Sequence, residues 1–513
     1  MIRAFRIAIF FAVSFILTTN LFAQSVNIQE LDRYFQKSLI EWEIPGMAIA
    51  IVKNDSVIFA KGYGVRDITK ADKVDKNTLF GIASNTKAFT SAAIALLVEK
   101  GDIVWDDKVI DFLPYFKMYD SYVTSNMTIA DLLSHRSGLV TFSGDLLWYS
   151  TKYTREEIIK RAKNLKPKYP FRTHYGYSNI MFLAAGEIIP KITGKTWDLF
   201  VDEKFFKPLG MTSTNTSISK FGKNLNIAQP HVMVDDKVTK IKYISWDNIA
   251  AAGGINSNVV DMSKWIQMLL NKGVYKDKTI IPEERLKELW APQTIQKIER
   301  FNEIYTPTTH FSAYGLGWDL FDYHGRKIIN HSGGLDGMIS KVVLVPEEGL
   351  GFVVLTNSIN YLPEALMYKI LDTYLSTNTR DWSNLYLRFY NGNKEYEKEE
   401  NAKKEKERKL NTKPSFELSR YAGTYRSSLY GDAKISLLNG KLQIQFLPAP
   451  DFISDLTHWE NNTFQIKFEK FPSLPKGTVE FTIDKSGKIS TMKVDVPNPD
   501  FDFTELDFKK VVE

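Results

Sequence analysis

Apolar and polar positions near the start of the chain, and again after residue 320, follow the pattern of a sheet flanked by helices. Residues 28–41 show a helical period, and the next two apolar runs are short and separated by Asn54-Asp55, a pair typical of tight turns. A second helical stretch, residues 363–375, follows the last strand-like run. The strand-like runs are residues 47–52, 57–60, 327–330, 340–345 and 351–356. We therefore predict an α/β (α+β) domain with one sheet, built from strands at both ends of the segment 28–375.

The region between those strands carries helix signals instead. Capping boxes, in which a threonine at the helix start is followed three residues later by Asp or Glu, begin at Thr128 and Thr154. Pro282 opens a further helix that extends to Trp290. The middle of the chain is therefore predicted to be a mainly helical insertion.

The end of the chain changes character twice. Of the sixteen residues from 394 to 409, seven are positive and six negative, with Glu and Lys at helical spacing, which favours a solvated linker helix. After Pro414, short alternating strands are separated by turns such as Asn439-Gly440, which predicts an all-β module. We expect the linker to be a spacer between two independently stable bodies. The predicted boundaries are 1–23, 24–378 for the main domain, 379–413 for the linker and 414–513 for the all-β module.

The first 23 residues have the pattern of an export signal. Arg3 and Arg6 precede an apolar stretch at residues 7–17, and the small residue Ala23 stands at the cleavage position. The alternative, a membrane anchor, is disfavoured because a spanning helix needs about 20 apolar residues. We expect the signal to be removed, which leaves no stable membrane anchor, and the chain to be exported, to the periplasm of a bacterium.

Composition and charge narrow the possible chemistry. Hydrophobic residues make up 44% of the 513 positions, enough to form folded cores. A net charge of +6 gives no reason to expect a nucleic-acid partner. The chain has no cysteine, which excludes thiol nucleophiles, thiolate metal sites and disulfides. Any covalent catalysis must therefore use an oxygen or nitrogen nucleophile.

The first candidate for such chemistry is Ser84-Asn85-Thr86-Lys87, which leads into an apolar helix. Ser84 stands at the helix start, and Lys87 lies one turn later on the same face. A lysine enclosed by protein can act as the base for a serine because burial lowers its pKa. The alternative is a helix-capping serine beside a surface lysine. The same spacing also occurs at Ser217, Ser473 and Ser490, but only Ser84 opens a helix predicted to be buried.

Two further motifs contain residues suited to acid–base work and binding. Tyr177-Ser178-Asn179 precedes another apolar helix, and a phenol can carry protons while a carboxamide can orient a lysine and a substrate amide. His331-Ser332-Gly333-Gly334 follows a predicted strand. Each motif taken singly has a structural explanation as good as a functional one.

In this order, the three motifs resemble those of the penicillin-recognising serine hydrolases. The resemblance is closest to the class C β-lactamase-like branch, with its penicillin-binding proteins, D-alanyl-D-alanine carboxypeptidases, D-aminopeptidases and esterases. It implies an antiparallel sheet flanked by helices, as in β-lactamases and transpeptidases. Other family-like stretches are residues 132–139, 208–212, 252–254 and 333–337. For residues 132–139 we favour a structural role as a helix cap and turn.

The resemblance also implies roles for the residues of the first two motifs. Ser84 would be the acylated nucleophile and Lys87 its proton partner. Tyr177 would share the general acid and base work with Lys87, and Asn179 would hold the substrate amide.

The third motif is implied to bind the substrate. His331 and Gly333 would contact it, although His331 stands where the family often has lysine, which weakens the expected grip on a carboxylate. The backbone N–H groups of Ser84 and Gly334 would form the oxyanion hole.

The sequence gives no sign of a metal or cofactor. Its seven histidines show neither His-x-His nor HExxH spacing, and the GxSxG elbow of α/β-hydrolases is missing. We therefore predict an exported serine hydrolase that forms an acyl-enzyme with D-amino-acid peptides or small esters. The alternatives are a true β-lactamase and a non-hydrolytic penicillin- or peptide-binding receptor. The partner is a small-molecule or peptide substrate, and the oligomeric state stays open.

The all-β module has a resemblance of its own. Residues 418–425 and 456–459 resemble the small β-barrel domain of unknown function that is often appended to these hydrolases, which implies a lipocalin-like shape. Two roles are equally compatible with the sequence: the barrel only covers the catalytic domain, or it extends over the active site.

Overall fold

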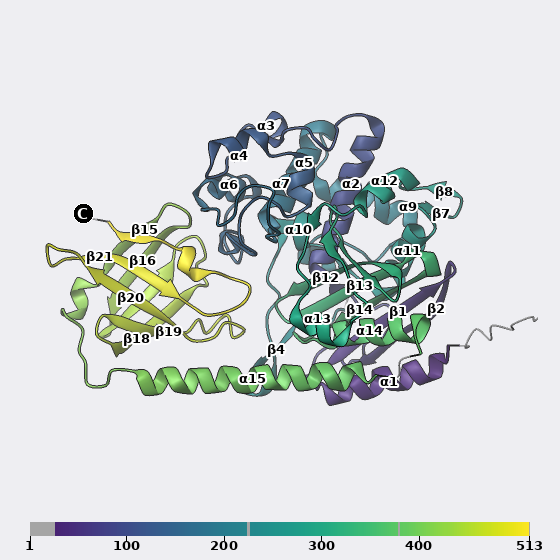
Figure 1. Cartoon of the computed structure of the whole chain (residues 1–513). Coiled ribbons are helices and arrows are strands. Elements are labelled where there is room, and N and C mark those ends of the chain that lie inside the picture. The colour runs from purple at the N-terminus through teal and green to yellow at the C-terminus, as the bar shows by residue number, and fades with distance from the viewer. Residues whose placement is uncertain (1–25, 223–225, 378–379, 512–513) are drawn as a thin grey trace, which may run out of the picture.

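The computed structural model describes residues 26–222, 226–377 and 380–511. Figure 1 shows a sheet domain with a helical region, a long helix along one side, and a barrel at the C-terminus. The predicted export signal, residues 1–23, lies outside the described residues. Within the described ranges, no helix is long and apolar enough to cross a membrane.

The sheet has eight antiparallel strands in the order β2-β1-β14-β13-β12-β11-β10-β9. β1, from the start of the domain, pairs with β14, from its end, and Ile49 lies opposite Val354. The predicted sheet built from both ends is therefore confirmed. Its strands are β1 (Gly46–Lys53), β2 (Ser56–Gly64), β9 (Thr294–Ile295), β10 (Ser312–Tyr314), β11 (Asp319–Tyr323), β12 (Arg326–Leu335), β13 (Met338–Val345) and β14 (Leu350–Thr356).

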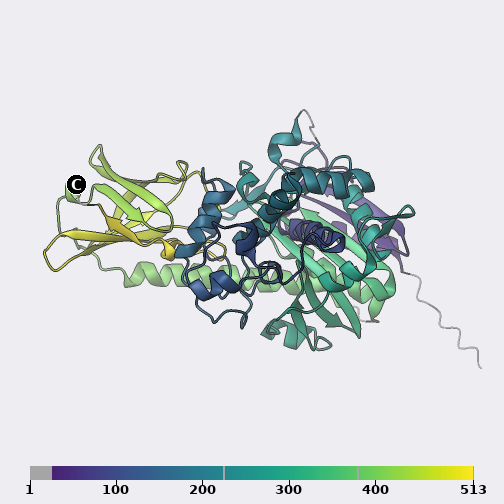
Figure 2. The same cartoon turned by 90° about the horizontal axis from the view of Figure 1, so that it is seen from above.

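Helices cover both faces of the sheet (Figures 1 and 2). On one face, α1, α14 and the start of α15 share an apolar cluster with the strands, to which Phe35, Leu366 and Trp382 contribute. On the other face, α11 contacts β1 and β14. This double covering explains why β14 is buried along its whole length. The helices are α1 (Ile28–Glu41), α11 (Val259–Leu270), α14 (Leu362–Leu375) and α15 (Trp382–Glu407).

The middle of the chain forms the predicted helical region around α2, which contacts α7, α10 and α12. Both predicted capping boxes are present: the side chain of Thr128 accepts from the N–H of Asp131, and that of Thr154 from the N–H of Glu157. The helices of this region are α2 (Thr86–Lys100), α3 (Val109–Phe112), α4 (Ser121–Asn126), α5 (Ile129–Leu133), α6 (Arg155–Arg161), α7 (Asn179–Thr193), α8 (Trp197–Val201), α9 (Lys207–Leu209), α10 (Ala250–Gly253), α12 (Glu283–Leu289) and α13 (Arg300–Tyr305).

The C-terminal module is the predicted all-β barrel, which is closed and has eight strands. Aromatic side chains such as Tyr425, Phe446 and Phe481 are buried in its core, which is therefore filled rather than hollow. Its strands are β15 (Gly423–Ser427), β16 (Gly431–Leu438), β17 (Lys441–Phe446), β18 (Ile453–Glu460), β19 (Thr463–Ile466), β20 (Gly477–Ile483), β21 (Ile489–Asp495) and β22 (Phe508–Lys510).

The barrel also packs directly against the helical region. The ring centres of Tyr149 and Phe501 lie 4.1 Å apart, and the Tyr153 hydroxyl donates to the Tyr430 carbonyl at 2.6 Å. Apolar side chains of both parts form one continuous core cluster. The charged segment 394–409 lies largely in α15, and these contacts join the barrel to the helical region in addition to that helix. The independent stability of the two bodies stays a prediction. The first turn of α15 is itself anchored, since Trp382 is fully buried.

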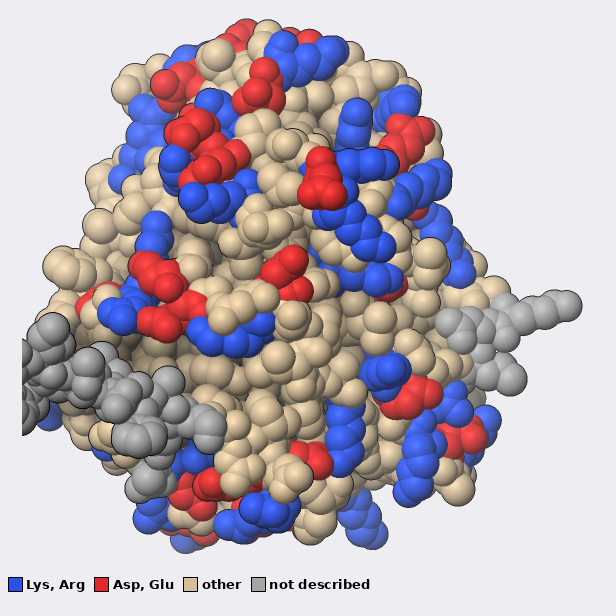
Figure 3. All heavy atoms as spheres, turned by 90° about the vertical axis from the view of Figure 1, so that its right-hand side faces the viewer, with Lys and Arg blue, Asp and Glu red and all other residues tan. Residues whose placement is uncertain are grey.

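The surface at the sheet-domain end of the molecule has mixed charge. Figure 3 shows Lys and Arg side chains interspersed with Asp and Glu, with no broad patch of one sign on this face. This distribution gives no electrostatic footprint for a nucleic acid on the face shown.

Candidate active site

Ser84 lies in a strained turn beside the sheet. It is the middle residue of a 3-10 turn, η1 (Ala83–Asn85), that leads directly into α2. Ala83 has a φ of 46°, a left-handed conformation that costs a residue other than glycine about 1–3 kcal/mol. Ser340 on β13 supports the turn, because its hydroxyl donates to the Ile82 carbonyl at 2.7 Å. The turn places Ser84 at the wall of a pocket.

Lys87 is completely buried one turn after Ser84. Its Nζ lies 3.0 Å from Ser84 Oγ, 2.6 Å from Asn179 Oδ1 and 2.9 Å from the Ala252 carbonyl oxygen. Burial lowers the pKa of Lys87 well below its usual value. A neutral amine donates twice, to Asn179 and Ala252, and its lone pair then faces Ser84. The alternative of a surface lysine is therefore wrong.

Asn179 is fixed by a carboxyl group on its other side. Its Nδ2 donates to Asp145 Oδ2 at 2.6 Å, which leaves Oδ1 as the atom that faces Lys87. Asp145 is 2% exposed, and burial raises its pKa to about 7. Asn179 therefore orients Lys87 and keeps one N–H for a substrate.

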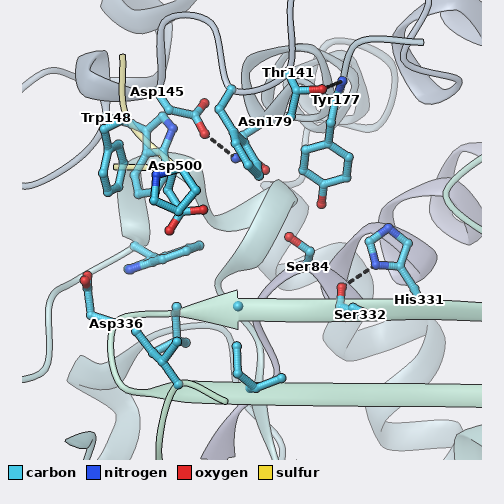
Figure 4. A pocket seen from close by; sticks show the side chains of 18 of the residues that line it. Ser84, Thr141, Asp145, Trp148, Tyr177, Asn179, His331, Ser332, Asp336 and Asp500 are labelled. Atoms are coloured by element: carbon cyan, nitrogen blue, oxygen red, sulfur yellow. Dashed lines mark hydrogen bonds between the residues drawn. The ribbon is translucent and has the colours of Figure 1, made fainter. Parts of the chain in front are cut away.

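The hydroxyl of Tyr177 points toward Ser84 (Figure 4), and a hydrogen bond with Ser84 is one of the influences on its pKa. Burial is the largest influence and raises the pKa of Tyr177 well above its usual value, so the hydroxyl keeps its proton at neutral pH. Lys87 Nζ lies 4.6 Å from the ring centre of Tyr177 and 5.4 Å from that of Phe182. These two rings would stabilise Lys87 once it has accepted a proton.

His135 holds the loop that carries Tyr177. Its Nδ1 accepts from the N–H of Ser178 at 3.0 Å, and its ring centre lies 4.3 Å from that of Tyr177. Burial lowers the pKa of His135, which keeps the imidazole neutral and able to accept. The stretch 132–139, for which the sequence favoured a structural role, thus positions one of the candidate catalytic residues.

The glycines of the third motif lie where β12 passes Ser84. Gly333 is buried, and a Cβ atom there would lie 2.2 Å from the Ile82 carbonyl oxygen and 3.0 Å from the Ser84 nitrogen. Only glycine allows this close approach. Gly334, the next residue, lines the same pocket as Ser84.

His331 also lines the pocket, but both its ring nitrogens are occupied within the protein. Nε2 lies 2.8 Å from the Tyr314 hydroxyl, and Nδ1 lies 2.5 Å from the Ser332 carbonyl oxygen. Burial is the main influence that lowers the pKa of His331, to about 3. His331 is therefore neutral and offers no positive charge to a substrate carboxylate.

The pocket in front of Ser84 has a volume of about 550 Å³ (Figure 4). Its walls come from the sheet, the helical region and a loop of the barrel. Besides Ser84, Tyr177, Asn179, His331 and Gly334, its lining includes Thr141, Phe142, Asp145, Trp148, Tyr175, Trp246, Asp319, Ser332, Leu335, Asp336, Ile339, Ile359, Tyr361, Pro499, Asp500 and Phe501.

The other three Ser-x-x-Lys serines have different surroundings. Ser217 caps a short 3-10 turn, Ser490 lies on the barrel strand β21, and Ser473 donates to Asp336 at 3.3 Å. None of these three serines lines the pocket that contains Ser84. Their lysine spacing is accidental.

Several residues of the site carried no sequence signal that we used. Asp145 is a lone aspartate that belongs to no motif in the sequence. Ala252 acts through its backbone carbonyl, which every residue type has, so the residue type gives no signal. Asp500 belongs to the barrel loop, far from Ser84 along the chain. Ala252 does lie in the family-like stretch 252–254.

Replacing Asp145 with asparagine should lower kcat/KM about 10- to 100-fold, the loss expected for a hydrogen bond to a charged group. The new amide can donate as well as accept, so Asn179 is no longer held with Oδ1 toward Lys87. The Asp145 charge raises the pKa of Lys87, so its removal should also shift the acidic limb of the pH profile to lower pH.

The pH dependence of kcat/KM in both proteins measures this shift. Asp247→Asn, at an exposed aspartate outside the pocket lining, is the matched control. A change below twofold with an unmoved acidic limb would mean that Asp145 does not position the lysine.

The fold and the residues around Ser84 define a class of protein, the serine hydrolases. A family model described as Beta-lactamase matches residues 31–369, and a domain of unknown function (DUF3471) matches residues 407–510. The chain belongs to the β-lactamase family and is a serine hydrolase.

Named relatives agree with this family, and a solved structure shares the fold. The unguisins hydrolase ungD' of Aspergillus campestris is 31% identical over 381 residues, which covers 70% of this chain and 68% of that protein. Protein flp of Staphylococcus aureus is 29% identical over 359 residues, which covers 69% and 67%. The octameric penicillin-binding protein homologue from Pyrococcus abyssi shares the fold with a TM-score of 0.62 at 20% identity, over 94% of this chain and all of that one.

Proposed function

We propose that this protein hydrolyses amide or ester bonds through an acyl-enzyme on Ser84. The observation that carries the proposal is the buried Lys87, whose Nζ lies 3.0 Å from Ser84 Oγ. Lys87 takes the serine proton while Ser84 Oγ bonds to the substrate carbonyl carbon. The N–H groups of Ser84 and Gly334 stabilise the negative oxygen.

The leaving group then departs, and the same side chains serve the hydrolysis of the acyl-enzyme. Tyr177, which keeps its proton at neutral pH, protonates the leaving amine or alcohol as the carbonyl re-forms. Its proton is replaced from Lys87. Water then attacks the acyl-enzyme, with Lys87 and Tyr177 again moving the proton, and Ser84 is released.

The substrates we propose are D-amino-acid peptides or small esters. Neutral His331 supports this choice over substrates that must be held by a carboxylate, because it supplies no cation. We also propose that the chain acts outside the cytoplasm of a bacterium after removal of residues 1–23, on the basis of the N-terminal sequence pattern.

A fluorophosphonate probe should attach covalently to Ser84, since it reacts with activated serines without needing a particular substrate. Peptide mass spectrometry of the labelled protein locates the adduct. Ser84→Ala should abolish labelling, and Ser217→Ala, at a serine with the same lysine spacing, is the matched control. Labelling that survives Ser84→Ala would overturn the assignment.

The same protein also distinguishes the proposed hydrolase from the two alternatives, a non-hydrolytic receptor and a true β-lactamase. A receptor would be labelled without turning over esters, D-peptides or nitrocefin. A true β-lactamase would turn over nitrocefin rapidly and the other substrates negligibly. We expect ester or D-peptide turnover to exceed that of nitrocefin.

A further inference from the structure

We propose that the pocket selects substrates with a positively charged ammonium group in their acyl part. This inference rests on the proposed acyl transfer at Ser84 and specifies its substrate class. It starts from the charge of the pocket: among the described residues that line it there are four aspartates and neither lysine nor arginine. These aspartates are Asp145, Asp319, Asp336 and Asp500.

Three of the four aspartates gather on one side of Ser84. Figure 4 shows Asp145, Asp336 and Asp500 near Trp148, whereas His331 and Ser332 lie on the opposite side. They come from three parts of the chain: the helical region, the turn between β12 and β13, and the barrel loop after β21. Their convergence is a product of the tertiary fold.

One carboxylate oxygen in this group has unused hydrogen-bonding capacity. Asp336 Oδ2 is buried without a hydrogen-bond partner, whereas the Asp145 carboxyl, whose pKa is raised by burial, has the Trp148 indole as a hydrogen-bonding neighbour that lowers it. Buried acceptors are normally paired, so such an atom at a pocket wall indicates a missing donor. Asp336 Oδ1 accepts from the Tyr149 hydroxyl at 3.0 Å, which fixes that carboxyl in place.

The nearby cations are weak partners for these aspartates. Burial lowers the pKa of Lys87 and that of His331, which disfavours a positive charge on either side chain. Lys341 pairs with Glu364 at 2.7 Å and donates to Ser332 Oγ at 3.0 Å. Ser332 lies on the side of Ser84 away from the three aspartates (Figure 4). Burial also raises the pKa of Asp145 to about 7 and that of Asp336 to about 6, so a bound cation would favour the charged form of these carboxyl groups.

Aromatic side chains complete the environment. Trp148 lies 4.7 Å from Trp246 and 6.0 Å from Phe501 between ring centres, and all three rings line the pocket. Indole and phenyl faces attract ammonium groups. Carboxylates combined with aromatic faces suit an organic ammonium better than a bare metal ion, which prefers several oxygen ligands.

The position of Tyr177 decides which part of the substrate carries the ammonium. The leaving group takes its proton from Tyr177, which lies on the His331 side of Ser84 (Figure 4). The acyl group, which stays on Ser84, then extends toward the aspartates. The geometry therefore points to aminoacyl peptides, amides or esters with a free amine, and Asp500 gives the barrel a direct role in selecting them.

The test compares substrates that differ only in charge. Alanine p-nitroanilide, in both enantiomers, is matched with isobutyryl p-nitroanilide, in which a methyl group replaces the ammonium. The 6-aminohexanoyl and heptanoyl p-nitroanilides form a second pair with a longer reach. We expect kcat/KM to favour the cationic member of at least one pair by about tenfold or more, as for a hydrogen bond to a charged group.

Variants then assign the preference to the aspartates. Asp500→Asn and Asp336→Asn should each reduce the cationic-to-neutral ratio at least fivefold, and Asp507→Asn, at an exposed aspartate of the barrel outside the pocket lining, should not. If anilides are turned over too slowly, the same pairs are compared as competitors of fluorophosphonate labelling.

The outcomes separate this inference from the proposed function. If Ser84 is labelled but the cationic-to-neutral ratio of kcat/KM is near one, the ammonium site is overturned and the proposed acyl transfer is retained. The same holds if Asp500→Asn and Asp336→Asn both leave that ratio unchanged. Absence of labelling at Ser84 overturns both. A ratio that falls in both aspartate variants, with Asp507→Asn unchanged, supports both.

Discussion

Lys87→Met should lower kcat/KM by about 10²- to 10⁴-fold, the range that positioned acid–base groups contribute. Methionine fills a similar volume but provides neither a proton acceptor for Ser84 nor donors for Asn179 and Ala252. The wild-type rate should also fall as the pH drops through the lowered pKa of Lys87, because only the neutral amine can take the serine proton. This acidic limb should be missing from the variant.

Initial rates on a neutral p-nitrophenyl ester between pH 4 and pH 9 measure both effects. Lys220→Met is the matched control, because Lys220 follows Ser217 at the same spacing and is exposed. Circular dichroism checks that the variant folds, because leaving the buried Asn179 and Ala252 oxygens unpaired lowers the free energy of unfolding by about 1–3 kcal/mol each. A folded Lys87→Met protein with a rate within fivefold of wild type would remove Lys87 from the mechanism.

Local patterns allowed much of the fold to be predicted. The capping boxes at Thr128 and Thr154 form as expected, because a cap depends on residues three positions apart. The sheet built from both chain ends followed from matching strand-like runs. The Ser84–Lys87 pair was predictable for the same reason, since a helix brings residues i and i+3 together.

Contacts between distant segments could not be predicted in this way. Asp145 meets Asn179 only because η2 (Asp145–Leu147) and α7 are brought together by packing, and nothing in the spacing of these residues encodes that contact. The barrel illustrates the same limit. Its Glu505 accepts from the Gly144 N–H at 2.8 Å, next to Asp145, across more than half the chain. The charged helix and the barrel were visible in the sequence, but the residues that dock the barrel were not.

The barrel therefore belongs to the site in two ways. Glu505 supports the turn that carries Asp145, and Asp500 and Phe501 form part of the pocket wall. Of the two roles that the sequence left open, extension over the active site fits these contacts. The candidate catalytic residues are thus combined here with a pocket wall from a second domain, and the wall is where substrate choice can change.

Tyr177→Phe should lower kcat/KM for an anilide substrate by about 10²- to 10⁴-fold, because an amine leaves only after protonation. The variant keeps the ring whose centre lies 4.6 Å from Lys87 Nζ, so the environment of the lysine is preserved and only the hydroxyl is removed. The loss should be much smaller for a p-nitrophenyl ester, since p-nitrophenolate leaves without a proton. Comparing the two losses distinguishes proton donation from a general disturbance of the site.

Tyr175→Phe provides the matched control, because Tyr175 also lines the pocket and stands two residues earlier on the same loop. It should change both rates by less than about fivefold, well below the range for an acid–base group. Equal losses on the anilide and the ester in Tyr177→Phe would mean that the hydroxyl positions Ser84 rather than protonating the leaving group. Losses below fivefold on both substrates would make Tyr177 a wall residue, and the proton would then have to reach the leaving group from Lys87 itself.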